Sequence, residues 1–306
     1  MTVRSLDFLD LPLLPRYRRD MLPLDSARLM TRGNPLGAMA LLSYLNPRRH
    51  LYTAIASEDG NSLMGQVTLH EEETSARLTF LAPAKNVDGL FLPLAAHLST
   101  QAGEWGAFYL LAEVDEELPA FRSLRQGGFA MYAWQRVWKL PPAQETPEET
   151  WRTVESTDWI AVQNLHSQIV PALIQPVDAL PKQVTGLVCG SEGTLQAYVA
   201  VSRGPKGVWI QPFILPDSGC DTKMLANLSS AVSEWRGQPI YICVRSYQTW
   251  LESVLEDLGA EAGPRQAVMV KRLAKAIKEP QAAPVMEKTL AKVKTAAPLS
   301  RFKDES

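Results

Sequence analysis

The feature that most constrains this chain is a phrase that occurs twice. Leu124–Pro141 reads "LRQGGFAMYAWQRVWKLP", and Leu255–Ala274 reads "LEDLGAEAGPRQAVMVKRLA". Each phrase combines a helix end, a glycine turn and a long run with strand character. Pro83 and Pro216 also follow similar apolar runs and lie roughly 130 residues apart, like the two phrases. The repetition predicts two copies of one structural unit.

The hydrophobic periodicity predicts the same order of elements in each copy. We expect a short strand, helical segments, a three-strand antiparallel meander, a helix, a strand buried on both faces, a helix and a closing strand. Pro93 falls in the apolar helical pattern "FLPLAAHLSTQAG", so we expect it in the first turn of that helix, where proline is tolerated. The predicted fold class is α+β, with two tandem repeats, each a mixed, mostly antiparallel sheet flanked by helices.

The composition along the chain predicts the domain limits. We expect an N-terminal domain over 1–140 and a C-terminal domain over 151–275. Between them, "PPAQETPEET" is rich in proline and glutamate and has no apolar face, which is typical of a linker over 141–150. Residues 276–306 are rich in alanine, lysine and proline and predict a disordered basic tail, either simply solvated or in weak contact with an anion.

Composition also excludes several classes of function. The formal net charge of −2 gives no general affinity for polyanions, so no nucleic-acid partner is expected. No stretch approaches the roughly 18 apolar residues of a membrane span, and the expected location is the cytoplasm. The four histidines show no metal-binding spacing. Three scattered cysteines are expected to be buried free thiols: Cys189, Cys220 and Cys243.

This order of elements resembles the GNAT superfamily of N-acetyltransferases. The segment "LMGQVTL" is similar to the start of the family's third strand, and "LRQGGFAMYAWQRVWKL" resembles its closing helix, Gly-Phe turn and last strand. The resemblance covers most of Thr2–Leu140 and, more faintly, Thr150–Leu273. It implies acetyl-CoA as the acyl-donor substrate, held where the fourth and fifth strands splay apart. Those strands are "ARLTFLAP" with "FYLLAEV", and "GVWIQPFIL" with "IYICVRS".

The resemblance also implies a pyrophosphate site in the loop after the fourth strand. Backbone N–H groups opening the next helix would hold the phosphates, helped by the helix dipole. The family's loop has a proline, an arginine or glutamine three residues later, and glycines six and eight residues later. The first copy keeps Pro83 and Gly89, but Asn86 and Phe91 replace the other two, and Asp88 adds a negative charge.

The second copy departs further from this loop pattern. It keeps Pro216, and then reads Gly219, Thr222 and Met224, with Asp217 and Asp221 making the loop acidic. The first copy is therefore the expected cofactor site. Its candidate binding residues are Leu81, Ala82, Pro83, Asn86, Val87, Asp88, Gly89 and Leu90.

The catalytic residues cannot be assigned from the sequence. Many family members place a tyrosine acid four residues before the glycine of the Gly-Phe turn, where this chain has Leu124 and Leu255. Neither leucine donates a proton. Glu113 is a candidate base, with an exposed strand-end carboxylate as the alternative. Nearby strand tyrosines are expected to pack in the core or at a sheet edge: Tyr109, Tyr132 and Tyr241. Most tryptophans are expected to pack in the core or between the repeats: Trp134, Trp138, Trp209, Trp235 and Trp250.

Two functions remain open. One is an acyltransferase that moves an acetyl group from acetyl-CoA to a small-molecule amine. The alternative is a non-catalytic GNAT-like scaffold for ligand sensing or protein interaction. In either case, pairing of the two repeats within one chain would replace a homodimer, which predicts a monomer.

Overall fold

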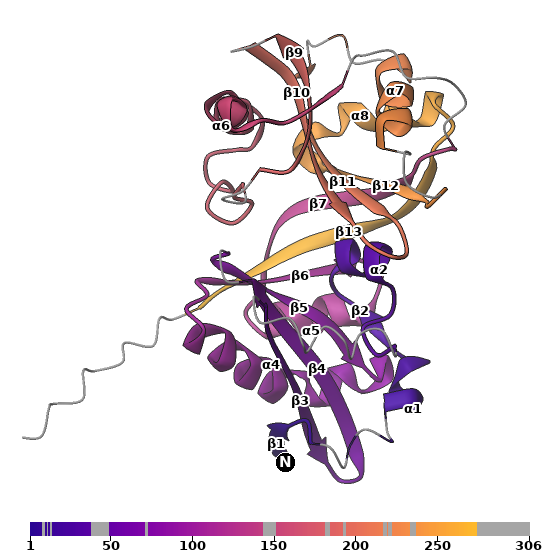
Figure 1. The fold of residues 1–306 in the computed structure, drawn as a ribbon. Coiled ribbons are helices and arrows are strands. Elements are labelled where there is room, and N and C mark those ends of the chain that lie inside the picture. The colour runs from indigo at the N-terminus through magenta and orange to yellow at the C-terminus, as the bar shows by residue number, and fades with distance from the viewer. Residues whose placement is uncertain are drawn as a thin grey trace, which may run out of the picture. The chain divides into compact units, whose positions relative to one another are not determined.

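A computed structural model describes most of the chain (Figure 1). The described residues are 1–7, 10, 12, 14–37, 49–70, 73–142, 151–180, 184–191, 194–216, 219, 222–232 and 237–273. They belong to one compact unit, which spans Met1–Ala276. Most of the expected linker and the whole expected tail lie outside the described residues, as do Cys220 and Trp235.

The first half contains the predicted strand, meander, helices and closing strand. Its elements are β1 (Thr2–Ser5), α1 (Leu14–Arg18), β2 (Leu22–Pro23), α2 (Ser26–Arg32), β3 (Arg49–Glu58), β4 (Asn61–His70), β5 (Ser75–Ala82), η3 (Ala84–Asn86), α4 (Val87–Glu104), β6 (Tyr109–Asp115), α5 (Pro119–Gln126) and β7 (Ala130–Lys139). Among these strands, β2 was not expected.

The second half repeats this order. Its elements are β8 (Arg152–Thr153), η4 (Ser156–Asp158), α6 (Trp159–Ile169), β9 (Gly186–Ser191), β10 (Thr194–Arg203), β11 (Val208–Ile214), α7 (Thr222–Val232), β12 (Ile240–Arg245), η6 (Ser246–Gln248), α8 (Trp250–Asp257) and β13 (Glu261–Arg272). The predicted α+β class and the tandem repeat are confirmed.

The strands of both halves join in one sheet, and its order shows an exchange. The order is β1-β3-β4-β5-β6-β13-β7-β12-β11-β10-β9-β8, with β2 paired to β5 beside this path. The closing strand of the second half, β13, lies between β6 and β7 of the first half. The closing strand of the first half, β7, pairs in turn with β12 of the second. Figure 1 shows β7 and β13 running between the two groups of elements. The limits 1–140 and 151–275 stay a prediction, and strand pairing crosses them.

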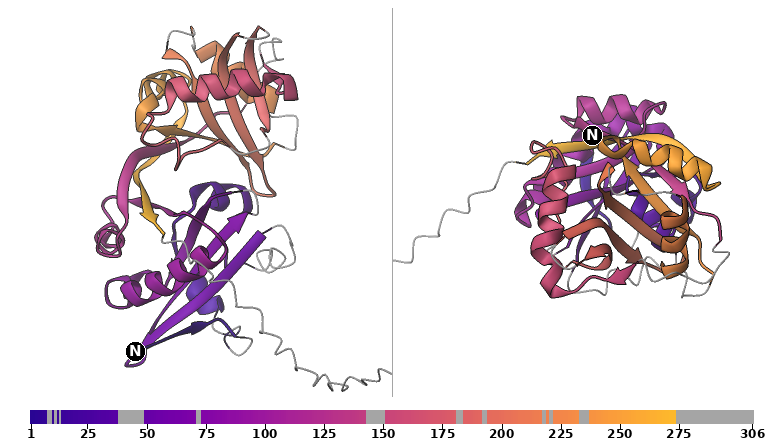
Figure 2. Two further views of the ribbon diagram at one scale, coloured as in Figure 1. Left: turned by 90° about the vertical axis from the view of Figure 1, so that its left-hand side faces the viewer. Right: turned by 90° about the horizontal axis from the view of Figure 1, so that it is seen from above.

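Helices cover the sheet on both faces. In the first half, α4 packs on β3, β4 and β5, and α5 packs on α4, over a core that includes Leu78, Leu94 and Phe129. In the second half, α7 and α8 cover one face of the sheet, and α6 covers the other through contacts with β10 and β11 (Figure 2). The apolar strand faces of each repeat are thereby buried, as an amphipathic sheet requires.

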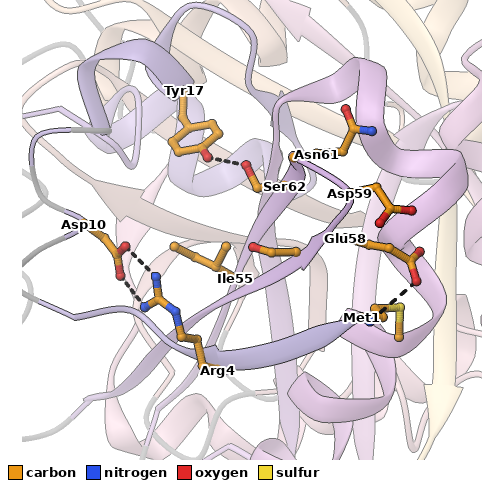
Figure 3. Close-up of a pocket in the computed structure, with 11 residues that line it drawn as sticks. Met1, Arg4, Asp10, Tyr17, Ile55, Glu58, Asp59, Asn61 and Ser62 are labelled. Carbon is orange, nitrogen blue, oxygen red and sulfur yellow. Dashed lines mark hydrogen bonds and ion pairs between the residues drawn. The ribbon is translucent and has the colours of Figure 1, made fainter.

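Each half contains a hydrogen-bonded arginine–aspartate ion pair, and the two pairs lie at equivalent positions of the repeat. Arg4 donates two hydrogen bonds to the carboxylate of Asp10, at 2.6 and 2.7 Å (Figure 3). Arg152 donates two to Asp158 at the same distances. In each case the arginine lies on the first strand of its half and the aspartate six residues later. The sequence carries this second repeat signature, which periodicity alone does not reveal.

The glycine turns that open the closing strands are also equivalent. The N–H of Phe129 donates to the carbonyl of Leu124, and the N–H of Ala260 donates to that of Leu255. Gly128 and Gly259 have φ values of 85° and 80°, where side chains are disfavoured. The repeated phrase therefore marks the same helix ending in both copies.

Pro93 does not lie where the sequence pattern placed it. Helix α4 begins at Val87, so Pro93 falls inside the helix and not in its first turn. A proline there removes the hydrogen bond to the carbonyl four residues earlier, which belongs to Gly89. Gly89 is exposed, so water can replace the missing N–H donor, and this explains why the helix tolerates the proline.

Candidate functional site

The fork that the resemblance predicts is present in the first half. Parallel pairing between β5 and β6 is limited to three residue pairs, from Ser75 with Tyr109 to Arg77 with Leu111. Beyond them, β5 continues to Ala82 without pairing to β6. The register between β4 and β5 also shifts at this point, which leaves Thr79 as the extra residue of a β-bulge. The strands thus part toward the loop that precedes α4.

The chain itself occupies this fork. The short strand β2 pairs with the open edge of β5, with Leu22 opposite Leu81 and Pro23 opposite Phe80. The next residue, Leu24, bridges both arms: its N–H donates to the Thr79 carbonyl at 3.0 Å, and its carbonyl accepts from the N–H of Glu113 at 2.9 Å. Leu24 is 1% exposed. The backbone groups that could pair with pantetheine amides are therefore already paired with the chain.

Glu113, the candidate base, is buried and not an exposed strand-end carboxylate. Its Oε2 accepts a hydrogen bond from the N–H of Ser26 at 2.8 Å, and its Oε1 lies 3.7 Å from Nη1 of Arg77. The side chain thus fixes the start of α2 against β6. This position gives Glu113 a structural role in closing the fork.

The eight predicted cofactor residues form the end of β5, the short helix η3 and the first turn of α4. Leu81, Ala82, Val87 and Leu90 are buried in the core. Ala82–Pro83 is a cis peptide bond. The Asn86 side chain donates to the carbonyl of Ser62 at 2.8 Å, and the Asp88 carboxylate accepts from the Ser123 hydroxyl at 2.5 Å. Asp88 is thereby engaged with α5. The assignment of these residues to acetyl-CoA stays a prediction.

Packing accounts for the residue at one position of this segment, Phe91, and not for the residue at another, Gly89. A Cβ added to Gly89 would meet no atom within 4 Å, so packing does not require glycine there. Phe91, which replaces the family's second glycine, is fully buried, and its ring lies against Gly127 and near the ring of Phe129. Phe91 therefore joins α4 to the glycine turn after α5, and its bulk serves the core.

The second half has its own fork, which a glutamine fills. Parallel pairing between β11 and β12 again stops after three residue pairs, at Ile210 with Ile242. Beyond that point, the Gln248 side chain accepts from the N–H of Ile214 at 2.9 Å and donates to the Pro212 carbonyl at 2.8 Å. Gln248 is 1% exposed. The Gln248 amide thus pairs with the open edge of β11, where the resemblance places the amide arm of acetyl-CoA. Asp217 and Asp221 of the following loop lie outside the described residues.

The leucines at the family's tyrosine position are core residues. Leu124 and Leu255 are both fully buried, the first on the inner face of α5 and the second on the inner face of α8. Among the tyrosines near the forks, Tyr132 lies at a β-bulge of β7, where the register with β13 shifts. Burial raises the pKa of Tyr132, against the lowering effect of Arg245, so its hydroxyl stays protonated at neutral pH.

A cavity of about 530 Å³ lies between the two halves, on the face of the sheet that carries α2 and α6. Its apolar walls include Leu111, Trp209 and Phe213. Trp209 was expected in the core; it is 6% exposed and also lines this cavity. The volume is in the range of small-molecule sites. Helix α2 closes one side by contacting β10 and β11, where the N–H of Lys206 donates to the Thr31 carbonyl at 2.9 Å.

Each half contributes one arginine–carboxylate pair to this cavity. In the first half, Arg77 faces Glu113. In the second, Nε of Arg245 lies 3.8 Å from Oδ2 of Asp178, which also accepts a hydrogen bond from the Tyr247 hydroxyl at 2.8 Å. Burial lowers the pKa of Arg77, but nearby carboxylates more than offset it, so the pKa is raised. Both guanidinium groups stay charged.

The Arg245 guanidinium is incompletely satisfied. Its side chain is 6% exposed, and neither Nε nor Nη1 has a hydrogen-bond partner among the described residues. Buried guanidinium nitrogens are normally paired, because an unpaired buried donor carries a desolvation cost. Arg245 lines the cavity, so its unsatisfied donors lie at the wall of a space that can hold a partner.

A second hollow, of about 440 Å³, lies near the tip of the β3–β4 hairpin (Figure 3). Two pairs of its polar side chains are hydrogen-bonded to each other: Arg4 to Asp10, and the Tyr17 hydroxyl to that of Ser62 at 2.6 Å. The N-terminal amine lies 3.6 Å from Glu58. This hollow adjoins the first fork from outside, because Tyr17 and Ile55 pack with Phe80 and Ala82 of β5. None of the described residues that line it has a buried side-chain polar atom without a partner.

No group of three or more potential metal ligands occurs among the described residues. Within the same residues, no helix has both the length and the apolar character needed to cross a membrane. Cys189 and Cys243 are buried free thiols, as expected.

Sequence reasoning names Glu113 and Trp209, which line the cavity, but it misses the arginines of the cavity and the residues that fill the forks. Arg77 and Arg245 each stand in an otherwise apolar strand, "ARLTF" and "IYICVR", and such an isolated charge is a usable signal. Asp178 and Gln248 carry no such signal, because they lie outside regular strands. The segment Leu22–Leu24 is too short to be recognised as a strand from alternation.

Comparison with known proteins identifies solved structures that have a similar fold. No family model matches the sequence, and no curated protein matches it. Among solved structures, a GCN5-related N-acetyltransferase from Sphaerobacter thermophilus is 14% identical, with a TM-score of 0.54, covering 90% of this chain and 96% of that chain. A tandem GNAT protein from the clavulanic acid biosynthesis pathway is 16% identical, with a TM-score of 0.50, covering 90% and 99%.

A putative acetyltransferase from Pyrococcus horikoshii gives a third match, at 11% identity and a TM-score of 0.50, covering 89% of each chain. At these identities the likeness concerns the fold and not the reaction. The chain therefore has the fold of the GNAT N-acetyltransferases, built as a tandem of two copies whose closing strands are exchanged.

Proposed function

We propose that this protein is a non-catalytic GNAT-fold scaffold that binds a small molecule in the cavity between its two halves. The observation that carries the proposal is the occupation of both forks by the chain: Leu24 bridges β5 and β6 in the first, and Gln248 bonds the open edge of β11 in the second. The buried leucines at the acid position support it, because Leu124 and Leu255 offer no proton.

The cost of opening the first fork can be estimated. Exposing the Leu24 side chain costs about 1.5 to 3 kcal/mol, and each of its two backbone hydrogen bonds adds roughly 0.5 to 1.5 kcal/mol. That cost is subtracted from any binding free energy of acetyl-CoA at this edge. It lowers the apparent affinity by on the order of 100-fold or more.

Acetyl transfer from acetyl-CoA to a small-molecule amine is the second candidate, and Gly89 favours it. Packing does not require glycine at this exposed position in the first turn of α4, whereas close approach of a phosphate would. In this case residues 20–26 leave the fork when the donor binds. The cavity beyond Glu113 would then receive the amine.

Thermal unfolding with millimolar acetyl-CoA, combined with an assay for thiol release over a panel of amines, separates the two candidates. The scaffold proposal predicts no thiol release above the uncatalysed rate and a melting temperature unchanged by the donor. A ligand present at about 100 times its dissociation constant adds about 2.7 kcal/mol of stability. A shift of that size with thiol release would establish the acyltransferase and refute the scaffold. Gly89→Leu is the control for the loop: the leucine side chain would block the approach of a phosphate, so a melting-temperature shift caused by acetyl-CoA at this loop should be lost in the variant.

We also propose that the chain is a monomer. The exchange of β7 and β13 satisfies within one chain the strand edges that a single copy would offer to a partner. Light scattering after size exclusion tests this, and a mass of two chains would refute it.

A further inference from the structure

We infer that the cavity between the halves binds a carboxylate-bearing molecule with an apolar or aromatic body, and that Arg245 is the residue that binds the carboxylate. Because this names the ligand class of the cavity, it rests on the proposed function. The Arg245 guanidinium is buried, and its Nε and Nη1 have no hydrogen-bond partner among the described residues.

The protein's own carboxylate does not satisfy Arg245. Asp178 Oδ2 lies 3.8 Å from Nε, beyond hydrogen-bond length, and it is already the acceptor for the Tyr247 hydroxyl. The two buried carboxylates of the cavity have partners elsewhere: Glu113 accepts from Ser26 and faces Arg77, and Asp25 accepts from the N–H of Arg28. An oxygen acceptor from a ligand would complete the Arg245 donors with charge-assisted hydrogen bonds.

The charges of the cavity favour a single negative charge on the ligand. Four carboxylates line it: Asp25, Glu73, Glu113 and Asp178. Five arginines line it: Arg28, Arg32, Arg77, Arg203 and Arg245. Arg32, Arg203 and Glu73 are exposed and screened by solvent, so the buried and half-buried groups are three arginines and three carboxylates. In this balanced setting a ligand with one negative charge meets less repulsion than a ligand with two. A doubly charged phosphate would face uncompensated repulsion from the buried Glu113 and from Asp178.

The walls specify the rest of the ligand. Trp209 and Phe213 on β11, with Leu111 on β6, present aromatic and aliphatic surface beside the charged groups. Small-molecule sites combine such apolar lining with a few polar groups that fix orientation. Because the cavity holds about 530 Å³, it can take a molecule larger than a simple short-chain acid.

Calorimetric titration of the full chain with benzoate, 3-phenylpropionate and indole-3-acetate tests this inference. Each acid is paired with its neutral amide, and 2-phenylethylamine and inorganic phosphate are further probes. At least one acid should bind with one site per chain, about 10- to 100-fold tighter than its amide, because the charge-assisted bonds to Arg245 are lost in the amide.

Variants assign the binding to Arg245. Arg245→Gln should weaken the acid by about 10- to 100-fold, whereas Arg203→Gln, which removes an exposed arginine of the same cavity, should change it by less than about threefold. Asp178→Asn keeps the acceptor for Tyr247 and removes the competing charge, so it should tighten the acid. Because Asp178→Asn should increase the affinity for the acid, it tests the role of Arg245 even if Arg245→Gln fails to fold.

Several results would overturn the inference: no acid of the panel binds, the amide binds as tightly as its acid, phosphate or the amine binds more tightly, or Asp178→Asn weakens the acid. These outcomes differ from failure of the proposed function. Thiol release from acetyl-CoA would refute the scaffold while leaving acid binding at Arg245 intact, whereas equal binding of acid and amide would refute the ligand class and leave the scaffold standing.

Discussion

Gln248 offers the sharpest test of how the forks are held closed. Its buried side-chain amide satisfies one donor and one acceptor of β11, the N–H of Ile214 and the carbonyl of Pro212. Gln248→Leu removes both partners while keeping a side chain of similar size. Each buried backbone group left unpaired costs about 1 to 3 kcal/mol. We expect Gln248→Leu to lower the free energy of unfolding by about 3 kcal/mol.

The matched control is Gln238→Leu. Gln238 also donates from its side chain to a proline carbonyl, that of Pro205 at 3.1 Å, but at an exposed site where water can replace it. Its loss should cost less than about 0.5 kcal/mol. In thermal unfolding followed by circular dichroism, Gln248→Leu should melt about 6 °C or more below the parent, and Gln238→Leu within about 2 °C. Equal melting temperatures for the two variants would refute the reasoning that Gln248 closes the fork.

Other predictions come from the repeat and from the contact of α2 with the second half. Because hydrogen bonds from an arginine hold the pKa of Asp10 and of Asp158 below the usual value, each ionised carboxylate stabilises the fold above the unfolded pKa of about 3.9. The stability is lost as the pH falls through the lower folded pKa. Asp10→Asn and Asp158→Asn should each cost about 1 to 2 kcal/mol at pH 7, since the paired arginines are partly exposed, and the difference should shrink as the pH is lowered below about 3.9. A difference that does not shrink with falling pH would show that the charge is not its source. Gly204→Ala should destabilise the chain by about 2 kcal/mol in a urea titration, because the new Cβ would lie 2.2 Å from the Thr31 carbonyl oxygen. Gly89→Ala, with open space around its Cβ, should leave stability unchanged or raise it by up to about 1 kcal/mol in the same urea titration.

Elements with a local signal were predictable from the sequence. The meander, the helix α5 with its glycine turn and the buried strand β6 each follow from periodicity and turn residues within a short window. The predicted position of Pro93 is wrong because apolar spacing does not locate the start of α4, whose first turn over Val87–Leu90 has a different composition.

The exchange of closing strands could not be predicted in this way. Strands β7 and β13 are both long and partly apolar, so either can pair beside β6, and the choice is made by contacts between distant residues. The cavity has the same origin: Arg77 and Arg245 come from strands more than 150 positions apart in the chain, and only the joined sheet brings both to one wall. The filling of the first fork depends on Leu24, one residue without a recognisable pattern around it.

Amide hydrogen exchange at Leu24 and Glu113, measured with and without millimolar acetyl-CoA, tests most directly whether the chain fills its own fork. Both N–H groups are hydrogen-bonded across the fork, the first to Thr79 and the second to Leu24. The account predicts slow exchange at both amides, close to the rate of the core strands, and no change when acetyl-CoA is added. Fast exchange in the free protein, or release of both amides by acetyl-CoA, would contradict it.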